Sequence, residues 1–204
     1  MIVGDPCSFA IESGITVALD RFAFVGLGSF VVHIGGRRYG DPDPEEGTLL
    51  SYAFEEIQSR LAWRGRHVAP FASEPDAGRI ADAHQDAYRD PIWAPDQEKE
   101  WFCGLLQEKF RAVIYSSQCE WGDEVFNDVS QVLHFDMGDR VRLIAFRSIE
   151  ADWHHDPATL ADVWLEAGEF YRILKEWRAR LEAEWRAAPK IKVSENGELL
   201  EDLP

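Results

Sequence analysis

A stretch of aromatic and β-branched residues that doubles back at two glycines constrains this fold more than any other feature. It runs from Phe22 to Tyr39, and the pair Gly35-Gly36 supplies the positive φ angles that a two-residue hairpin turn favours. Residues 8–19, which precede it, have the composition of a further strand. The N-terminal part of the chain is therefore predicted to form antiparallel strands.

A second hairpin is predicted in the C-terminal half of the chain. Residues 129–135 and 140–146 are both rich in strand-forming residues and are joined by a short polar turn. In the later strand, Val141 and Leu143 alternate with charged residues such as Arg142. Because successive side chains of a strand point to opposite faces, one face of this hairpin is expected in the core.

Helices are predicted between and after these strands. Apolar residues from Leu50 to Leu61 recur at the spacing of one helical face, with Thr48 as a cap and Gly65 as a stop. Three further helices are expected at residues 77–88, from a cap at Asp96 through Phe110, and at residues 169–185.

The last of these helices has the clearest amphipathic pattern. Phe170, Trp177 and Trp185 lie on its apolar face, and oppositely charged residues are spaced at i,i+4 on its polar sides. We expect this helix to pack on the sheet that carries Val141 and Leu143.

The predicted fold class is α+β, with antiparallel β-hairpins forming a sheet packed against several helices, including a long C-terminal helix. The strands come in antiparallel pairs without regular βαβ alternation, which favours this class over α/β. With 204 residues and 46% hydrophobic content, the chain can bury one sizeable core. We expect a single domain over residues 1–189 and a polar tail over residues 190–204.

The charge balance limits the partners of the protein. Lys and Arg total 21 against 37 Asp and Glu, a formal net charge of −16. This acidity disfavours binding to nucleic acid or to an anionic membrane, where attraction to phosphates supplies much of the affinity. A basic protein partner would be attracted, although acidity that serves only solubility is an equal alternative.

The sequence also favours a cytoplasmic location. Cys7, Cys103 and Cys119 are odd in number, widely spaced and without a metal-binding pattern, which indicates buried or incidental thiols in a reducing compartment. The N-terminal residues include an acid at Asp5 and lack the pattern of a signal peptide, and no run of residues is long and apolar enough for a membrane span.

Signatures of the common enzyme classes are absent, so no catalytic residue, metal or cofactor is predicted. The sequence has no phosphate loop, dinucleotide-binding glycine pattern, helical zinc pair or nucleophile elbow. The segment Asp152-Trp153-His154-His155-Asp156 could supply metal ligands, and it supports the alternative of a metal-dependent hydrolase or modifying enzyme. A turn followed by Pro157 is the more ordinary interpretation. His84 is likewise interpreted as part of a solvated charged helix face.

Acidic residues in the predicted loops are mixed with aromatic residues. Interfaces favour Trp and Tyr surrounded by complementary charge, whereas burial in the core is the competing explanation for each aromatic residue. Our candidate partner-binding residues are Trp121, Asp123, Glu124, Trp93, Asp90, Asp43 and Glu45.

Both ends of the chain resemble a known family. The segments that carry the resemblance are Ile2-Val3-Gly4-Asp5-Pro6, Ser8-Phe9-Ala10-Ile11-Glu12, residues 28–40, residues 140–146, and residues 163–174. They are similar to the start and to the closing strand, turn and helix of the bacterial immunity protein 42 family. The resemblance covers about half of the chain and does not include the middle, residues 66–128, where we expect partner specificity to lie.

The resemblance implies a function without catalysis. Such proteins are cytoplasmic antidotes encoded beside secreted polymorphic toxins, and each neutralises its cognate toxin by direct binding. The acidity fits a toxin domain with a basic cleft, such as a nuclease or deaminase, whose active site would be occluded. The matching motifs define no functional residue. A chaperone-like adaptor is a third possibility from the sequence.

Overall fold

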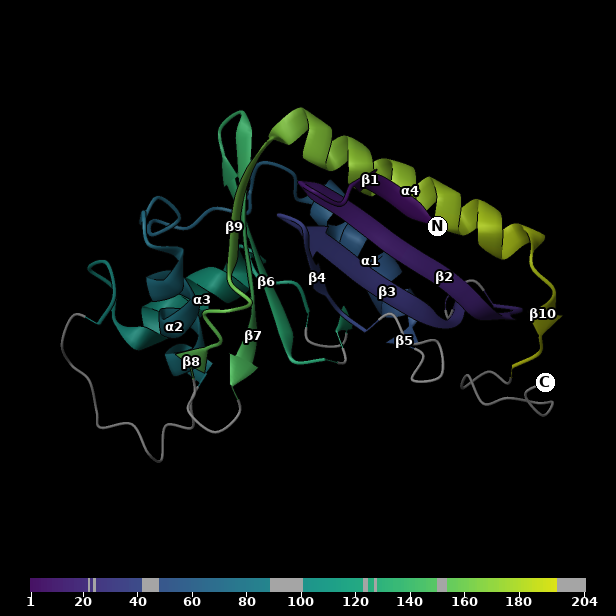
Figure 1. Ribbon diagram of the computed structural model, residues 1–204, viewed down its shortest axis with the longest axis horizontal. Helices are drawn as coiled ribbons and strands as arrows, with labels where there is room; N and C mark the ends of the chain where they lie inside the picture. The colour runs from purple at the N-terminus through teal and green to yellow at the C-terminus, as the bar shows by residue number, and fades with distance from the viewer. Residues whose placement is uncertain are drawn as a thin grey trace. The chain divides into compact units, whose positions relative to one another are not determined.

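The computed structural model describes residues 1–21, 23, 25–41, 48–88, 101–122, 125–126, 128–149 and 154–193 (Figure 1). It confirms the α+β class, with antiparallel hairpins, helices and a long C-terminal helix. The chain forms two compact units, each assembled from separate segments. Unit 1 contains Met1–Ala62, Gly122–Asp128 and Tyr171–Pro204, and unit 2 contains Trp63–Trp121 and Val129–Phe170. Compact units need not fold independently, so the single domain over residues 1–189 stays a prediction.

Unit 1 is built on a sheet with the strand order β1-β2-β3-β4. These strands are β1 (Ile2–Asp5), β2 (Phe9–Leu19), β3 (Gly26–Ile34) and β4 (Arg37–Tyr39). β5 (Thr48–Leu49) pairs with β3, and β10 (Lys190–Ile191) pairs with β2 in parallel. The predicted first hairpin is therefore confirmed, and β10 adds a short strand where the polar tail was expected to begin.

Close backbone approach explains a glycine in β3. A Cβ atom added to Gly28 would lie 2.0 Å from the carbonyl oxygen of Gly14 on β2. The register between the two strands shifts between Ile15 and Val17, so Thr16 is an extra residue in β2. Only glycine allows the strands to remain paired at this bulge.

Two helices contribute to unit 1. α1 (Leu50–Ala62) confirms the helix predicted from residue spacing, although Thr48 belongs to β5 and not to a helix cap. α4 (Ala167–Ala187) begins in unit 2 and continues through unit 1, where it runs along β1 and β2 (Figure 1). Leu50 and Ile57 of α1 are fully buried, as expected for the apolar face of an amphipathic helix.

The predicted packing partner of α4 is wrong for its two tryptophans, although Phe170 at its start contacts His134 on β6 at 4.7 Å. The Trp177 indole donates a 2.9 Å hydrogen bond to the Ser13 hydroxyl on β2, and its ring lies edge-on to Phe30 on β3. The Trp185 indole donates to the Leu19 carbonyl at 2.8 Å. The tryptophans of α4 thus bind the N-terminal sheet, rather than the strand that carries Val141 and Leu143.

Unit 2 has its own sheet, in which β7 (Arg140–Ile149) is the central strand. β6 (Ser130–Met137) pairs along one edge of β7, which confirms the second hairpin. β9 (Ala161–Glu166) and the short β8 (His154–His155) pair with β7 on the other side. Every residue of β7 from 141 to 146 is buried, so both faces of this strand are covered.

The helices of unit 2 enclose an aromatic core. They are α2 (Ala77–Tyr88) and α3 (Gln107–Ser116). The Phe71 ring stacks on Phe110 of α3 with a centroid distance of 4.4 Å, and it lies edge-on to Phe135 of β6. These contacts join the helices to the sheet within the unit.

The helix expected to run through Trp101 to Phe110 is shorter than predicted. α3 begins only at Gln107, because Cys103 and Gly104 adopt φ angles of 47° and 78° that no right-handed helix accommodates. Trp101 still contacts Phe110, edge-on at 5.2 Å. The cap expected at Asp96 lies outside the described residues.

Arg142 is the main correction to the predicted strand pattern. It was expected on a polar face, but it is 1% exposed. Its guanidinium donates two 2.9 Å hydrogen bonds to the Asp162 carboxylate and further bonds to the carbonyl oxygens of Ala72 and Glu74. A buried charge is tolerable only when it is paired in this way, so Arg142 ties the loop before α2 to the sheet.

In the described part of the chain, every helix is too short or too polar to cross a membrane.

We predict that Trp177→Ala destabilises the protein by about 3–5 kcal/mol, because it removes a fully buried indole and leaves the Ser13 hydroxyl without its donor. Urea unfolding followed by circular dichroism measures this change. Trp164→Ala is the matched control, since Trp164 is 37% exposed, and it should cost about 1 kcal/mol or less. Equal losses for the two variants would contradict the assignment of Trp177 to the core.

Candidate functional site

Most of the predicted partner-binding residues lie outside the described part of the chain. These residues are Asp43, Glu45, Asp90, Trp93, Asp123 and Glu124. Their roles therefore stay predictions. The nearest described residues along the chain are Asp41 and Thr48 for the first two, Tyr88 and Trp101 for the next two, and Gly122 and Val125 for the last two.

Trp121 is the one predicted partner-binding residue that the structure describes. It is 1% exposed, and its backbone N–H donates a 2.9 Å hydrogen bond to the Val132 carbonyl on β6. Its burial agrees with the core alternative that the sequence left open. A partner could not reach the Trp121 side chain at this buried position without a local rearrangement. Its role in binding therefore remains a prediction.

A hydrogen bond in unit 1 joins two described residues that are far apart in the sequence. The backbone N–H of Gly40 donates to the Asp128 carboxylate at 3.1 Å. Gly40 has a φ of 98°, and an added Cβ would lie 2.5 Å from the Phe30 carbonyl oxygen, so the turn requires glycine. Phe126 packs on Phe30 with a centroid distance of 6.2 Å. The segment around residues 125–128 is thereby fixed beside β3 and β4.

The same segment forms a pocket with α1, which we call the α1 pocket. Its lining residues are Tyr52, Glu55, Glu56, Ser59, Gly122 and Val125, and its volume is about 210 Å³. Tyr52 is 42% exposed, whereas Val125 is buried. Gly122 and Val125 are the described residues on either side of Asp123 and Glu124.

An ion pair holds one carboxylate of the α1 pocket in place. Glu56 Oε1 lies 2.6 Å from Nε of Arg60, which is fully buried one helical turn later. The other carboxylate oxygen, Oε2, lies on the side of Gly122, where an added Cβ would approach it to 3.6 Å. Glu55 is exposed. Tyr52, Glu56 and Ser59 lie on one side of α1 because of its helical spacing. They are not among the candidate residues from the sequence, because those candidates were taken from predicted loops.

A second charged group lies on the N-terminal sheet. Glu12 Oε2 accepts hydrogen bonds from His33 at 2.8 Å and from Arg38 at 3.2 Å. Burial alone would raise the pKa of the Glu12 carboxyl, but the hydrogen bonds from His33 and Arg38 outweigh it and hold this pKa below its ordinary value. His33 on β3 is a diagonal neighbour of Glu12 on β2, and Arg38 on β4 pairs directly with His33, so the linear sequence does not show this cluster.

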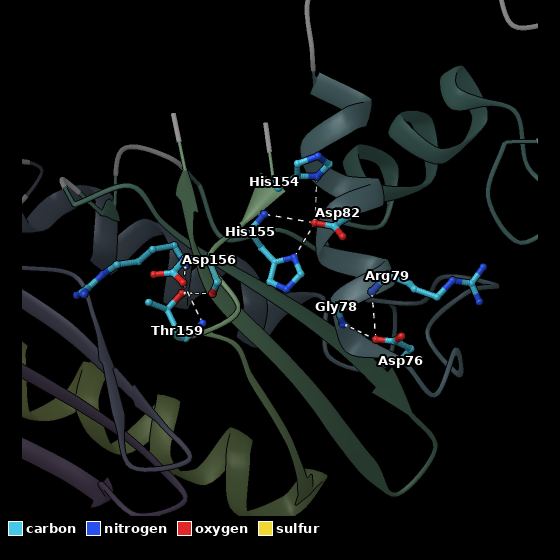
Figure 2. Close-up of polar contacts among 10 residues, drawn as sticks. Asp76, Gly78, Arg79, Asp82, His154, His155, Asp156 and Thr159 are labelled. Carbon is cyan, nitrogen blue, oxygen red and sulfur yellow. Dashed lines mark hydrogen bonds and ion pairs between the residues drawn. The ribbon is translucent and has the colours of Figure 1, made fainter. Parts of the chain in front are cut away.

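Figure 2 shows the histidine segment that was considered as a metal site. His155 is 8% exposed, and its Nδ1 lies 2.6 Å from Oδ1 of Asp82 on α2. His154 Nδ1 lies 3.5 Å from the same oxygen and is largely exposed. Asp152 lies outside the described residues. The histidines therefore share one carboxylate oxygen that fastens β8 to α2.

The nearby acids serve turns and helix ends. The Asp156 side chain accepts a 2.9 Å hydrogen bond from the Ala158 N–H, and its carbonyl accepts from Thr159 (Figure 2). Asp76 accepts from the N–H groups of Gly78 and Arg79 in the first turn of α2. Among the residues that the structure describes, no group of three or more His, Cys, Asp and Glu side chains is arranged to hold a metal ion.

His84 differs from its prediction as part of a solvated face. It is 2% exposed, and its Nε2 lies 3.0 Å from Oε1 of Glu120. Its ring contacts Tyr88 and Phe146. The face of α2 that carries His84 packs on the sheet, because alanines at neighbouring positions let the helix approach closely.

We predict that Glu12→Gln lowers stability at neutral pH and has no effect in strong acid. A carboxyl whose pKa is lower in the folded state than in the unfolded state stabilises the fold above its unfolded pKa, and this contribution is lost as pH falls through the folded pKa. Urea unfolding of both proteins at pH 7 and near pH 3 tests the sign. A deficit that grows on acidification would show that the Glu12 carboxylate does not contribute in this way.

Comparisons with known proteins agree with the resemblance found in the sequence. The crystal structure of CdiI from Burkholderia dolosa AUO158 is similar with a TM-score of 0.54 and 12% identity, over 88% of this chain and 99% of that chain. At this identity the likeness concerns the fold alone. None of the curated proteins matches. The family model of immunity protein 42 matches residues 1–180, and the chain therefore belongs to the immunity protein 42 family.

Proposed function

We propose that this immunity protein neutralises its cognate toxin by stoichiometric binding and without catalysis. Membership of the immunity protein 42 family supports the existence of a cognate toxin. Two described contacts in unit 1 lie close in sequence to four of the predicted acids. Gly40, which precedes Asp43 and Glu45, is bonded to Asp128, and Gly122, which precedes Asp123 and Glu124, lines a pocket with α1. The Gly40–Asp128 hydrogen bond is the observation that carries the proposal.

The charge of the protein defines the chemistry of the partner. With a formal net charge of −16, it would repel an acidic surface and attract a basic one. A toxin that acts on nucleic acid, such as a nuclease or deaminase, needs a basic substrate cleft. Binding of acidic loops at that cleft would occlude the active site and exclude the substrate. Neither nucleic acid nor a membrane is part of this proposal.

We place this interaction in the cytoplasm, with a toxin encoded by the adjacent upstream gene. Cys7, Cys103 and Cys119 are odd in number and widely spaced in the sequence, which suits a reducing compartment. The metal-dependent enzyme alternative gains no support, since His155 and Asp156 already bond to Asp82 and to the turn that follows. No cofactor is required for inhibition by occlusion.

We predict that the loop acids act mainly on the rate of association. Asp43→Asn combined with Glu45→Gln should lower the association rate about threefold to tenfold at low ionic strength and flatten its salt dependence. Surface-binding kinetics with the toxin domain from the upstream gene provide the measurement. Asp139→Asn with Glu166→Gln removes the same charge from exposed positions in unit 2 and is the control.

The opposite result would identify the acidity as a solubility feature. If complex formation is independent of ionic strength and neither double variant changes the association rate, the interface lies on an apolar surface. Trp121 is buried, so a Trp121→Ala variant tests a contact with the toxin only if its thermal melt is unchanged.

We predict that replacement of His154 and His155 by Ala leaves protection against the toxin unchanged. His154→Ala should be neutral for stability, whereas His155→Ala should cost about 1–2 kcal/mol because it removes the buried bond to Asp82. Co-expression with the toxin measures protection, and a thermal melt measures folding. A folded variant that no longer protects would make the metal-dependent enzyme the leading explanation.

A further inference from the structure

The α1 pocket combines features that select for one kind of group. Its volume of about 210 Å³ is below the range of about 300–1,000 Å³ in which pockets enclose small-molecule ligands. It is therefore suited to a single inserted side chain. Val125 contributes an apolar surface, and Tyr52 contributes a partly exposed aromatic ring.

The charges of the pocket favour a cation. The lining residues that the structure describes include two carboxylates, Glu55 and Glu56, and no basic side chain. The buried Arg60 forms an ion pair with Glu56 Oε1. Glu55 adds an exposed carboxylate to the lining.

The ion pair also prepares Glu56 for binding. Because Arg60 is fully buried and holds Oε1 at 2.6 Å, the Glu56 side chain loses little freedom when a ligand arrives. Its Oε2 lies toward Gly122, where an added Cβ would approach it to 3.6 Å. A fixed carboxylate, an exposed carboxylate and an aromatic ring form the set of groups that binds a guanidinium or ammonium ion.

We propose that the α1 pocket receives one basic side chain, arginine or lysine, from the cognate toxin. The proposal rests on the function proposed above and names the place where the acidic surface engages its partner. Glu55 and Glu56 accept charge-assisted hydrogen bonds from the inserted cation, and Tyr52 contacts its face. Gly122 and Val125, which line the pocket, are the described residues nearest in sequence to the predicted acids Asp123 and Glu124.

A small probe tests the pocket without the toxin. N-acetyl-arginine amide should shift the backbone amide resonances of Tyr52 and Gly122, with a dissociation constant in the millimolar range. N-acetyl-citrulline amide has the same shape without the charge and should leave these resonances in place. Equal shifts with the two compounds, or shifts that do not centre on the pocket, would overturn the proposal.

Variants separate charge from shape. Glu55→Gln should weaken binding of the arginine amide about tenfold, which corresponds to the loss of about one charge-assisted hydrogen bond. Gly122→Leu keeps every charge and should abolish binding by filling the pocket, whereas Gly122→Ala fits at ordinary contact distance and reports on folding. Glu166→Gln removes one exposed charge elsewhere and should have no effect. Binding that survives Gly122→Leu would overturn the proposal.

Co-expression with the toxin domain then distinguishes the pocket from the proposed function. If the unaltered protein protects against the toxin, and Glu55→Gln and Gly122→Leu reduce this protection without changing the thermal melt, the result supports both the pocket and the proposed function. Full protection by both variants overturns the pocket and leaves the immunity function intact. If the unaltered protein does not bind the toxin but binds the arginine amide, the proposed function fails, and the cation selectivity of the pocket still stands.

Discussion

Burial of one face of the N-terminal sheet by the C-terminal helix is the constraint on which the rest of unit 1 depends. Trp177 and Trp185 of α4 bind Ser13 and Leu19 of β2, across sequence separations of 164 and 166 residues. An isolated antiparallel sheet with an exposed apolar face is unstable, so β2 and β3 require this helix. Because the entropy cost of closing a loop grows only slowly with its length, a large insertion between the sheet and its helix is tolerated. The inserted segments supply the whole of unit 2.

Unit 2 is stabilised by a core of its own and by polar groups that are satisfied inside it. The stacked rings of Phe71 and Phe110 lie on the sheet, and Arg142 bonds to Asp162 and to two loop carbonyls. Buried ions of this kind contribute less to stability than apolar packing, but they fix one geometry, because an unpaired buried charge is strongly unfavourable. The same logic applies in unit 1, where buried Arg60 orients Glu56. There, a stabilising ion pair also presents a carboxylate to solvent.

The histidine segment illustrates how chemistry suggested by residue types depends on geometry. A run of His and Asp has the composition of a metal site, yet His154 and His155 converge on a single Asp82 oxygen, and Asp156 serves the next turn. The acidic surface has the opposite character. Its residues have no catalytic pattern, but α1 and the segment beside it form a pocket with two carboxylates and an exposed tyrosine ring.

The sequence by itself determined the local structure and the family. Glycine turns, strand alternation and helical spacing are short-range physics, so both hairpins, α1 and α4 were predictable, and the net charge follows directly from the composition. The similarity of several segments to the immunity protein 42 family could also be recognised from the sequence alone. Tertiary structure alone decided which sheet α4 covers, that Trp121, His84 and Arg142 are buried, and that Tyr52, Glu56 and Gly122 share one pocket. These outcomes depend on contacts between residues far apart in the chain, and a one-dimensional pattern does not specify which of several apolar faces will meet.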